Sequence, residues 1–251
     1  AVELAAQLRP GTLVISFQNG VRNAEVLRAA MPAQTVLAGM VPFNVLNCGD
    51  GRFHQGSAGV LDVAADAGLT GCADLFANAG LPLSLQADMR AVLWGKLLLN
   101  LNNAINALSG EPLKAELSQR DYRRCLALAQ REALGLYAKA GITPMQLTAL
   151  PPHWLARLLT VPDWLFQRLA QRMLAMDPLA RSSMWEDLEA GRRTEVDWIQ
   201  GEVVQLAAEL GGKAPVNARL VALIREAELA GAGRKSLTGA ELLNRLQAAL
   251  A

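Results

Sequence analysis

The sequence has 251 residues, of which 52% are hydrophobic and 19% are charged, and its formal net charge is +1 at pH 7. This length suits one large domain or two ordinary ones. The small net charge gives no reason to expect a nucleic acid or a membrane surface as partner. No apolar run is long enough to span a bilayer, and the first residues lack the basic start of a signal peptide.

The cysteines and histidines are few and widely separated. Cys48, Cys72 and Cys125 form no Cys-x-x-Cys pair, which favours a reducing compartment, and we expect a cytoplasmic protein. His54 and His153 have no ligand spacing around them, so we expect no metal site.

The first 87 residues show alternating strand and helix signals. In chain order they predict a helix end at 4–8, strands at 12–17 and 35–41 with a helix at 24–31 between them, strands at 52–55 and 59–63, a helix at 73–79 and a strand at 81–86. The continuous apolar runs at 12–17 and 35–41 are typical of parallel strands. The two short strands after residue 50 favour an antiparallel meander.

From residue 88 onward apolar residues recur at helical spacing. The predicted helices cover 89–108, 120–140, 154–159, 164–174, 184–190, 195–210, 217–230 and 239–250. The fold class is therefore α/β plus all-α, with a partial Rossmann-type nucleotide-binding domain at 1–87 and a helical domain at 88–251. A complete domain of that type opens with a Gly-x-Gly-x-x-Gly turn, and none occurs here. We expect its glycine-rich N-terminal part to be missing, by truncation or in a natural short form, unless the small sheet is unrelated.

Residues 93–108 combine an oily helix with a polar stripe. Lys96, Asn100 and Asn103 stand at i, i+4 and i+7, on one helical face. Burying a cation and two amides is costly without partners, so this face is a candidate site for a carbonyl or anionic ligand. The alternatives are a lysine that reaches water and amides that bond neighbouring helices, an interpretation that suits Asn102 and Asn106 better.

Three further positions could contribute to a site. Asn19 follows a strand end, where open α/β sheets bind ligands, although Asn before Gly is also a common turn residue. Ser183 with Glu186 fits a capping box at a helix start, which is also a favourable place for a carboxylate. Thr194 is the expected N-cap of the next helix, and on physical grounds alone Glu195 is an acid in its first turn.

Four motifs in order carry a resemblance to a known family. They are Gln18-Asn19-Gly20, Trp94 to Asn100, Ser182-Ser183-Met184 through Thr194-Glu195-Val196-Asp197, and Gly212 to Asn217. Together they resemble ketopantoate reductase (2-dehydropantoate 2-reductase). The resemblance implies a Rossmann domain and a helical 6-phosphogluconate-dehydrogenase-like C-terminal domain, with the active site in the cleft between them. It also implies NADPH-dependent reduction of ketopantoate to pantoate in pantothenate and coenzyme A biosynthesis.

The resemblance assigns roles to individual residues of the helical part. Lys96 would be the general acid that protonates the carbonyl oxygen. Asn100 and Asn103 would bind the substrate, with Asn106 as a rival to Asn103. Ser183 would hold the substrate's carboxylate or hydroxyl end. A nearby ammonium group stabilises the negative charge that hydride addition builds on the oxygen.

The resemblance assigns two residues to cofactor binding. By resemblance Asn19 would lie beside the nicotinamide and the substrate, and Glu195 would contact the ribose; the choice of NADP over NAD has no other basis. Without the glycine-rich loop we expect these 251 residues to bind NADPH poorly. Two alternatives stay open: a related reductase for another 2-oxo acid, and a non-catalytic helical dimerisation or binding fragment. The expected partner is a small-molecule 2-oxo acid, with a homodimer left open.

Overall fold

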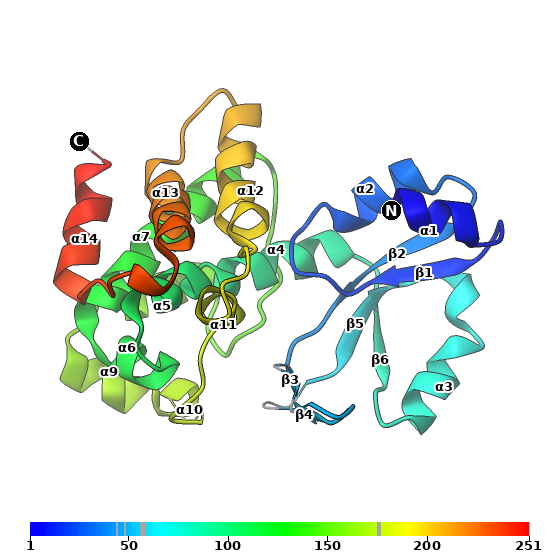
Figure 1. Cartoon of the computed structure of the whole chain (residues 1–251), viewed down its shortest axis with the longest axis horizontal. Helices are drawn as coiled ribbons and strands as arrows, with labels where there is room; N and C mark the ends of the chain where they lie inside the picture. The colour runs from blue at the N-terminus through cyan, green and yellow to red at the C-terminus, as the bar shows by residue number, and fades with distance from the viewer. Residues whose placement is uncertain (44, 48, 56–58, 175–176, 251) are drawn as a thin grey trace. The chain divides into compact units, whose positions relative to one another are not determined.

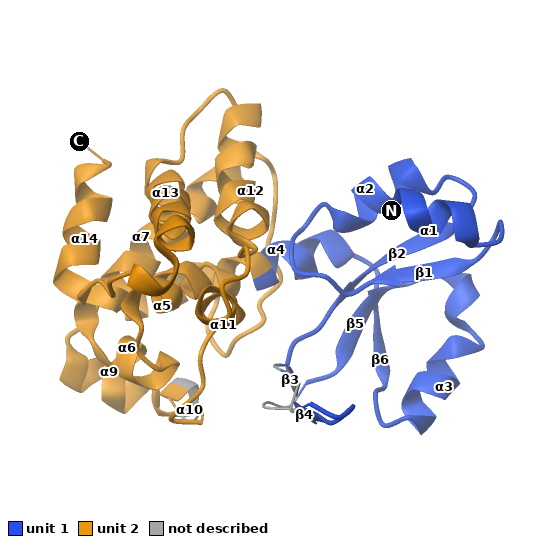
Figure 2. Ribbon diagram, viewed as in Figure 1, with its two compact units in different colours: residues 1–96 blue, residues 97–251 orange. Residues whose placement is uncertain are grey.

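The computed structural model describes residues 1–43, 45–47, 49–55, 59–174 and 177–250, so Cys48 lies outside the described residues. The chain divides into two compact units, Ala1–Lys96 (unit 1) and Leu97–Ala251 (unit 2) (Figures 1 and 2). The dividing point lies inside helix α4 (Met89–Asn100), whereas the start of helical spacing predicts a domain boundary just before this helix.

Unit 1 contains a four-stranded sheet in the order β1-β2-β5-β6. These strands are β1 (Leu13–Ser16), β2 (Thr35–Met40), β5 (Leu61–Ala64) and β6 (Leu83–Gln86). Strands β1 and β2 are parallel, with Val14 opposite Val36, as their continuous apolar runs predict. Strand β5 is antiparallel to β2 and parallel to β6. The unit is thus a small mixed sheet with a β-α-β start.

The helices of unit 1 are α1 (Val2–Gln7), α2 (Asn23–Ala30) and α3 (Cys72–Asn78). Helix α2 packs along β2, and α3 packs along β6 (Figure 1). Leu37 of β2 and Val63 of β5 form a buried core together with Leu69. The alternation of strands and helices predicted for this part of the chain is confirmed.

The predicted meander is wrong in its pairing. Strand β4 (Phe53–Gln55) pairs with β3 (Val45–Asn47) in a separate two-stranded sheet, while β5 joins the main sheet between β2 and β6. The three-residue β3 was not predicted, because so short a segment carries no periodicity. Tight turns between short strands therefore led to the wrong partner for β5.

Unit 2 is helical. After α4, its helices are α5 (Asn102–Ser109), α6 (Leu113–Ser118), α7 (Arg120–Lys139), α8 (Pro152–Leu158), α9 (Asp163–Leu169), α10 (Gln171–Leu174), α11 (Ser183–Glu189), α12 (Val196–Glu209), α13 (Pro215–Ala230) and α14 (Gly239–Ala248). The long α7 packs against α5, α6, α8, α12, α13 and α14 (Figure 1). Its apolar stripe, including Cys125, Ala129 and Ala133, is fully buried. No helix in the described ranges has the length and apolarity to cross a membrane.

The predicted helix at 89–108 is interrupted at Leu101, which separates α4 from α5. Two buried glutamines bond to carbonyl oxygens at this point: Gln130 Nε2 of α7 donates to Leu98 O at 3.1 Å, and Gln200 Nε2 of α12 donates to Leu101 O at 3.0 Å. Side-chain donors satisfy carbonyls where a helix is interrupted. The interruption could not be predicted locally, because both donors come from distant parts of the sequence.

Two other helix predictions need correction. The predicted helix at 164–174 is split into α9 and α10 around Ala170. Helix α6 was not predicted, because Gly110-Glu111-Pro112 was interpreted only as a break. In the structure Gly110 ends α5 with φ 71°, and Pro112 directly precedes α6, a position where its missing N–H costs nothing.

Candidate active site

Lys96, Asn100 and Asn103 are partly buried positions along α4 and α5, while their neighbours Leu97 and Leu101 are buried. Lys96 and Asn100 lie one turn apart on α4, and Asn103 is in the first turn of α5. The polar positions on both sides of the interruption at Leu101 are therefore partly exposed.

Lys96 has an unusual electrostatic environment. Burial lowers the pKa of its ammonium group below the ordinary value of 10.5. Within the described part of the chain, its side chain makes no hydrogen bond and no ion pair. A partly desolvated ammonium group without a counter-ion stabilises a developing negative charge better than a fully solvated one, and it releases its proton more readily.

Asn102 and Asn106 have the structural role that is predicted for them. Their Nδ2 atoms donate to Glu116 Oε2 at 3.1 Å and 3.0 Å. Asn106 Nδ2 also donates to Glu111 O at 2.9 Å. These bonds occupy the amide group of Asn106 inside unit 2, which favours Asn103 over Asn106 as the substrate ligand.

Glu116 was missed in the sequence, although it is completely buried. Burial raises the pKa of its carboxyl group to about 8, while the hydrogen bonds from Asn106 and Asn102 act in the opposite direction. In the sequence, Glu116 falls between the predicted helices at 89–108 and 120–140, and nothing in its neighbouring residues indicates that it is buried. The only available signal was the pair of asparagines one turn apart on an oily helix, which require a polar partner.

The start of α11 differs from the prediction by one residue. Ser182, and not Ser183, is the N-cap: its Oγ accepts a hydrogen bond from Trp185 N at 3.2 Å. Ser183 is therefore the first helical residue, and it is exposed. This shift leaves the Ser183 hydroxyl available for a ligand, since the neighbouring serine supplies the cap.

The segment before α11 is bonded to α5 and α6. Ser182 N donates to Asn106 Oδ1 at 2.9 Å, and Ser182 Oγ donates to Asn103 O at 3.2 Å. Leu113 N donates to Ala180 O at 2.8 Å. These bonds bring the start of α11, and with it Ser183, beside Asn103, although the two residues are 80 positions apart in the sequence.

Helix α12 starts at Val196, so Glu195 occupies the N-cap position but its side chain makes no capping bond. Thr194, the predicted cap, accepts a hydrogen bond from Val196 N through its Oγ1 at 3.3 Å. Thr194 also donates from N and Oγ1 to Glu228 Oε1, both at 2.8 Å. Burial opposes the ionised form of Glu228, yet the bonds from Thr194 and Arg225 lower the pKa of its carboxyl group below the ordinary value. An ionised Glu228 thus anchors the backbone that carries Glu195.

Asn19 lies in unit 1, in the loop between β1 and α2. Its backbone oxygen accepts a hydrogen bond from Asn23 Nδ2 at 2.5 Å, and Gly20 after it has φ 107°, a conformation that favours glycine. The turn interpretation of Asn19 is thus supported. The loop also follows the carboxyl end of a parallel strand, where open α/β sheets bind ligands.

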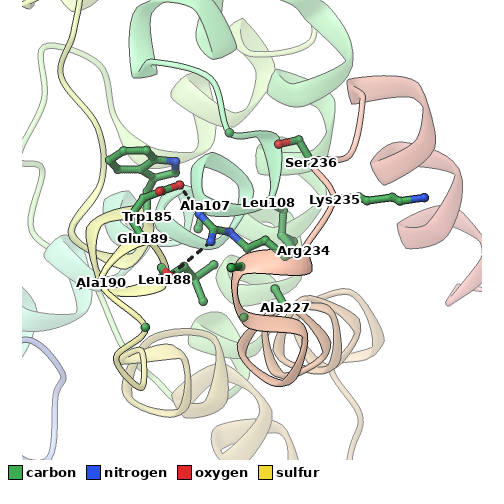
Figure 3. A pocket seen from close by; sticks show the side chains of 14 residues that line it. Ala107, Leu108, Trp185, Leu188, Glu189, Ala190, Ala227, Arg234, Lys235 and Ser236 are labelled. Atoms are coloured by element: carbon green, nitrogen blue, oxygen red, sulfur yellow. Dashed lines mark hydrogen bonds and ion pairs between the residues drawn. The ribbon is translucent and has the colours of Figure 1, made fainter.

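A separate cavity of about 570 Å³ lies in unit 2 between α5, α11 and the 231–236 segment (Figure 3). Arg234 extends across it to form an ion pair with Glu189 and a hydrogen bond to Leu188 O. None of the predicted site residues lines this cavity. Of the two cations in its lining, Arg234 is already paired with a carboxylate, which leaves Lys235 as the cation for an anionic ligand within the described residues.

Two family models cover most of the chain. The model described as ketopantoate reductase PanE/ApbA C terminal matches residues 88–228, more than half of the sequence. The model described as ketopantoate reductase PanE/ApbA matches residues 1–67. The chain belongs to the ketopantoate reductase family. The family is one of oxidoreductases that act on a small 2-oxo acid with a nicotinamide cofactor.

Individual relatives agree with this membership. The 2-dehydropantoate 2-reductase of Halobacterium salinarum is 28% identical over 227 residues, which are 88% of this chain and 69% of the relative. The crystal structure of a PanE/ApbA family ketopantoate reductase from Ralstonia eutropha is 28% identical, with a TM-score of 0.74 over 90% of this chain and 70% of that one. D-mandelate dehydrogenase with NADH and anilino(oxo)acetate shares the fold, at 16% identity and a TM-score of 0.74 over 91% and 71%. The expected fold, a partial Rossmann domain followed by a helical domain, is thereby confirmed.

Proposed function

We propose that this ketopantoate reductase family member reduces ketopantoate to pantoate with NADPH, and that Lys96 is the general acid. The observation that carries the proposal is the partly buried Lys96 ammonium group, which has no partner in the described residues and a lowered pKa, on the same helical stripe as Asn100 and Asn103.

The chemistry follows from these residue types. A bound nicotinamide cofactor supplies the hydride to the carbonyl carbon. Lys96 stabilises the charge that develops on the carbonyl oxygen and donates its proton to that oxygen. The side-chain amides of Asn100 and Asn103 orient the substrate by hydrogen bonds, and the exposed hydroxyl of Ser183 binds its carboxylate or hydroxyl end.

Each unit, taken by itself, offers one residue type that suits the nicotinamide or ribose end of the cofactor. Asn19 follows the carboxyl end of β1, and the adjacent Gly20 leaves the backbone open to a ligand. Glu195, held by the Thr194–Glu228 bonds, offers a carboxylate to ribose hydroxyls. The pyrophosphate is outside this proposal, because the 251 residues contain no Gly-x-Gly-x-x-Gly turn.

The test is steady-state reduction of ketopantoate by NADPH, measured on the protein encoded by the complete gene. Lys96→Ala should lower kcat by about 10²- to 10⁴-fold, the usual contribution of a general acid. Lys96→Arg should be nearly as poor, because a guanidinium keeps the charge but does not release its proton. Lys139→Ala, an exposed lysine on α7, is the matched control. Near-normal kcat in Lys96→Ala would disprove the assigned role.

A related reductase that prefers another 2-oxo acid is the second candidate within the same chemistry. Its general acid and carboxylate-binding residues would be the same, and only the side chain of the substrate would differ. Comparing kcat/KM for ketopantoate with that for smaller and aromatic 2-oxo acids separates the two. A preference of more than about tenfold for another acid, equal to about 1.4 kcal/mol, would replace ketopantoate as the substrate.

Self-association into a homodimer is part of the proposal and is measured by light scattering.

A further inference from the structure

We propose that Glu116 is a positioning residue for the 2-oxo acid site: through Asn106 it holds the first turn of α11, and therefore Ser183, against α5. Only the assignment of the substrate to Ser183 rests on the proposed function. The contacts that support the positioning role lie entirely within unit 2, and Glu116 belongs neither to the family resemblance nor to the residues assigned to catalysis.

The orientation of the Asn106 amide is the first step of the argument. Two acceptors, Glu116 Oε2 and Glu111 O, lie on its Nδ2 side, at 3.0 Å and 2.9 Å. An amide group donates only from nitrogen. The two acceptors therefore direct Nδ2 toward α6 and leave Oδ1 facing Ser182, whose N–H it accepts at 2.9 Å.

The second step leads from Ser182 to the substrate residue. Ser182 is 5% exposed, and its Oγ both donates to Asn103 O and accepts from Trp185 N. This hydroxyl thus joins α5 to the first turn of α11, in which Ser183 is the first residue. Loss of the acceptor at Glu116 would leave the amides of Asn102 and Asn106 with buried donors to satisfy, and reorientation of Asn106 would remove the acceptor of Ser182 N.

The two oxygens of Glu116 are used unequally. Within the described residues, Oε2 accepts the bonds from Asn102 and Asn106, while Oε1 is buried without a hydrogen-bond partner. A buried carboxyl group that serves only to stabilise the fold would stabilise it more if both of its oxygens had hydrogen-bond partners. The use of one oxygen to fix two amides on α5 is instead suited to orienting them.

The experiment compares Glu116→Met with Glu116→Gln. Methionine has a similar volume but no acceptor, so the KM for the 2-oxo acid should rise about tenfold while kcat changes by less than about threefold, as for lost uniform binding. Glutamine keeps an acceptor oxygen and should remain within about twofold of the original KM. The exposed Glu226→Gln on α13 is the matched control and should change neither constant.

A double-mutant cycle tests whether Glu116 acts through Ser183. Ser183→Ala alone should raise KM, and Glu116→Met added to it should raise KM little further, because both changes remove the same contact. Fully additive effects would overturn the proposal, and so would equal KM values for Glu116→Met and Glu116→Gln. A general loss of folding would lower kcat through the active fraction and would not give this pattern.

Amide hydrogen exchange followed by NMR separates this inference from the proposed function. Glu116→Met should speed exchange of the Ser182 and Trp185 amide protons about tenfold or more, while Glu116→Gln and Glu226→Gln should not. This readout needs no substrate, so it stands even if the protein reduces no 2-oxo acid. Should Glu116→Met not fold, Glu116→Asp withdraws the carboxyl group by one methylene and should give the same acceleration. Unchanged exchange at Ser182 in these variants would overturn the positioning role.

Discussion

The buried carboxyl group of Glu116 makes the stability of the protein depend on pH in a direction that can be calculated. Burial raises its pKa from 4.5 to about 8, against the opposing hydrogen bonds from Asn106 and Asn102. Between these two pH values the folded state binds one proton more than the unfolded state. The free energy of unfolding therefore falls as pH rises, by about 1.4 kcal/mol for each pH unit and by about 5 kcal/mol over the whole interval. The contribution is complete below pH 4.5 and lost above about pH 8.

Glu116→Gln provides the reference, because a carboxamide does not titrate and all other groups cancel in the comparison. Urea unfolding is measured for both proteins from pH 5 to 9 by tryptophan fluorescence, which reports mainly on unit 2. Four of the five tryptophans lie there, at positions 154, 164, 185 and 198. The nearby Tyr122 and Cys125 stay protonated in the folded state over this range, because burial raises the pKa of each to about 12, and their ionisation in the unfolded state is common to both proteins.

The stability difference, original protein minus Glu116→Gln, should decrease by about 1.4 kcal/mol for each pH unit up to about pH 8 and then become constant. A difference that stays constant from pH 5 to 8 would refute the reasoning, because it would mean that Glu116 ionises in the folded protein as it does in water.

Three further predictions concern other parts of the molecule. In a pH–rate profile, the decline of kcat at alkaline pH should have its midpoint below pH 10.5. The reason is that the proposed general acid, Lys96, must be protonated and burial lowers the pKa of its ammonium group. A midpoint at the ordinary lysine value would contradict this prediction. Arg123→Met should lower the free energy of unfolding by about 3 kcal/mol in urea titrations, since the buried guanidinium bonds three carbonyl oxygens and pairs with Asp163; a loss under about 1 kcal/mol would show that these bonds contribute little. Glu132→Ala should cost about 2 kcal/mol, because its carboxylate caps the first N–H groups of α13, whereas the surface change Glu226→Gln should cost less than about 0.5 kcal/mol.

Much of the fold follows from local patterns. Continuous apolar runs identify β1 and β2, and period-3.6 spacing identifies the long helices of unit 2 within a few residues. The polar stripe of Lys96, Asn100 and Asn103 was also visible, because spacing along one helix determines which residues share a face. These features depend on residues close together in the sequence, and local reasoning therefore reaches them.

Other features depend on partners that are distant in the sequence. The position of β5 between β2 and β6 reflects strand pairing across long loops, which turn signals do not specify. The interruption at Leu101 depends on Gln130 and Gln200, which are 29 and 99 positions away. The structural role of Asn106 also depends on distant residues, since its amide donates to Glu116 on α6 and accepts from Ser182 before α11.

The residue types and their spacing were thus sufficient to recognise the family and the stripe on α4 and α5, because helix geometry and motif order are written in neighbouring residues. The tertiary structure alone decided which polar groups are satisfied inside the protein. Burial and hydrogen-bond partners arise when distant helices pack, and they change the pKa of Lys96, engage Asn106 with Ser182 and bury the carboxyl group of Glu116.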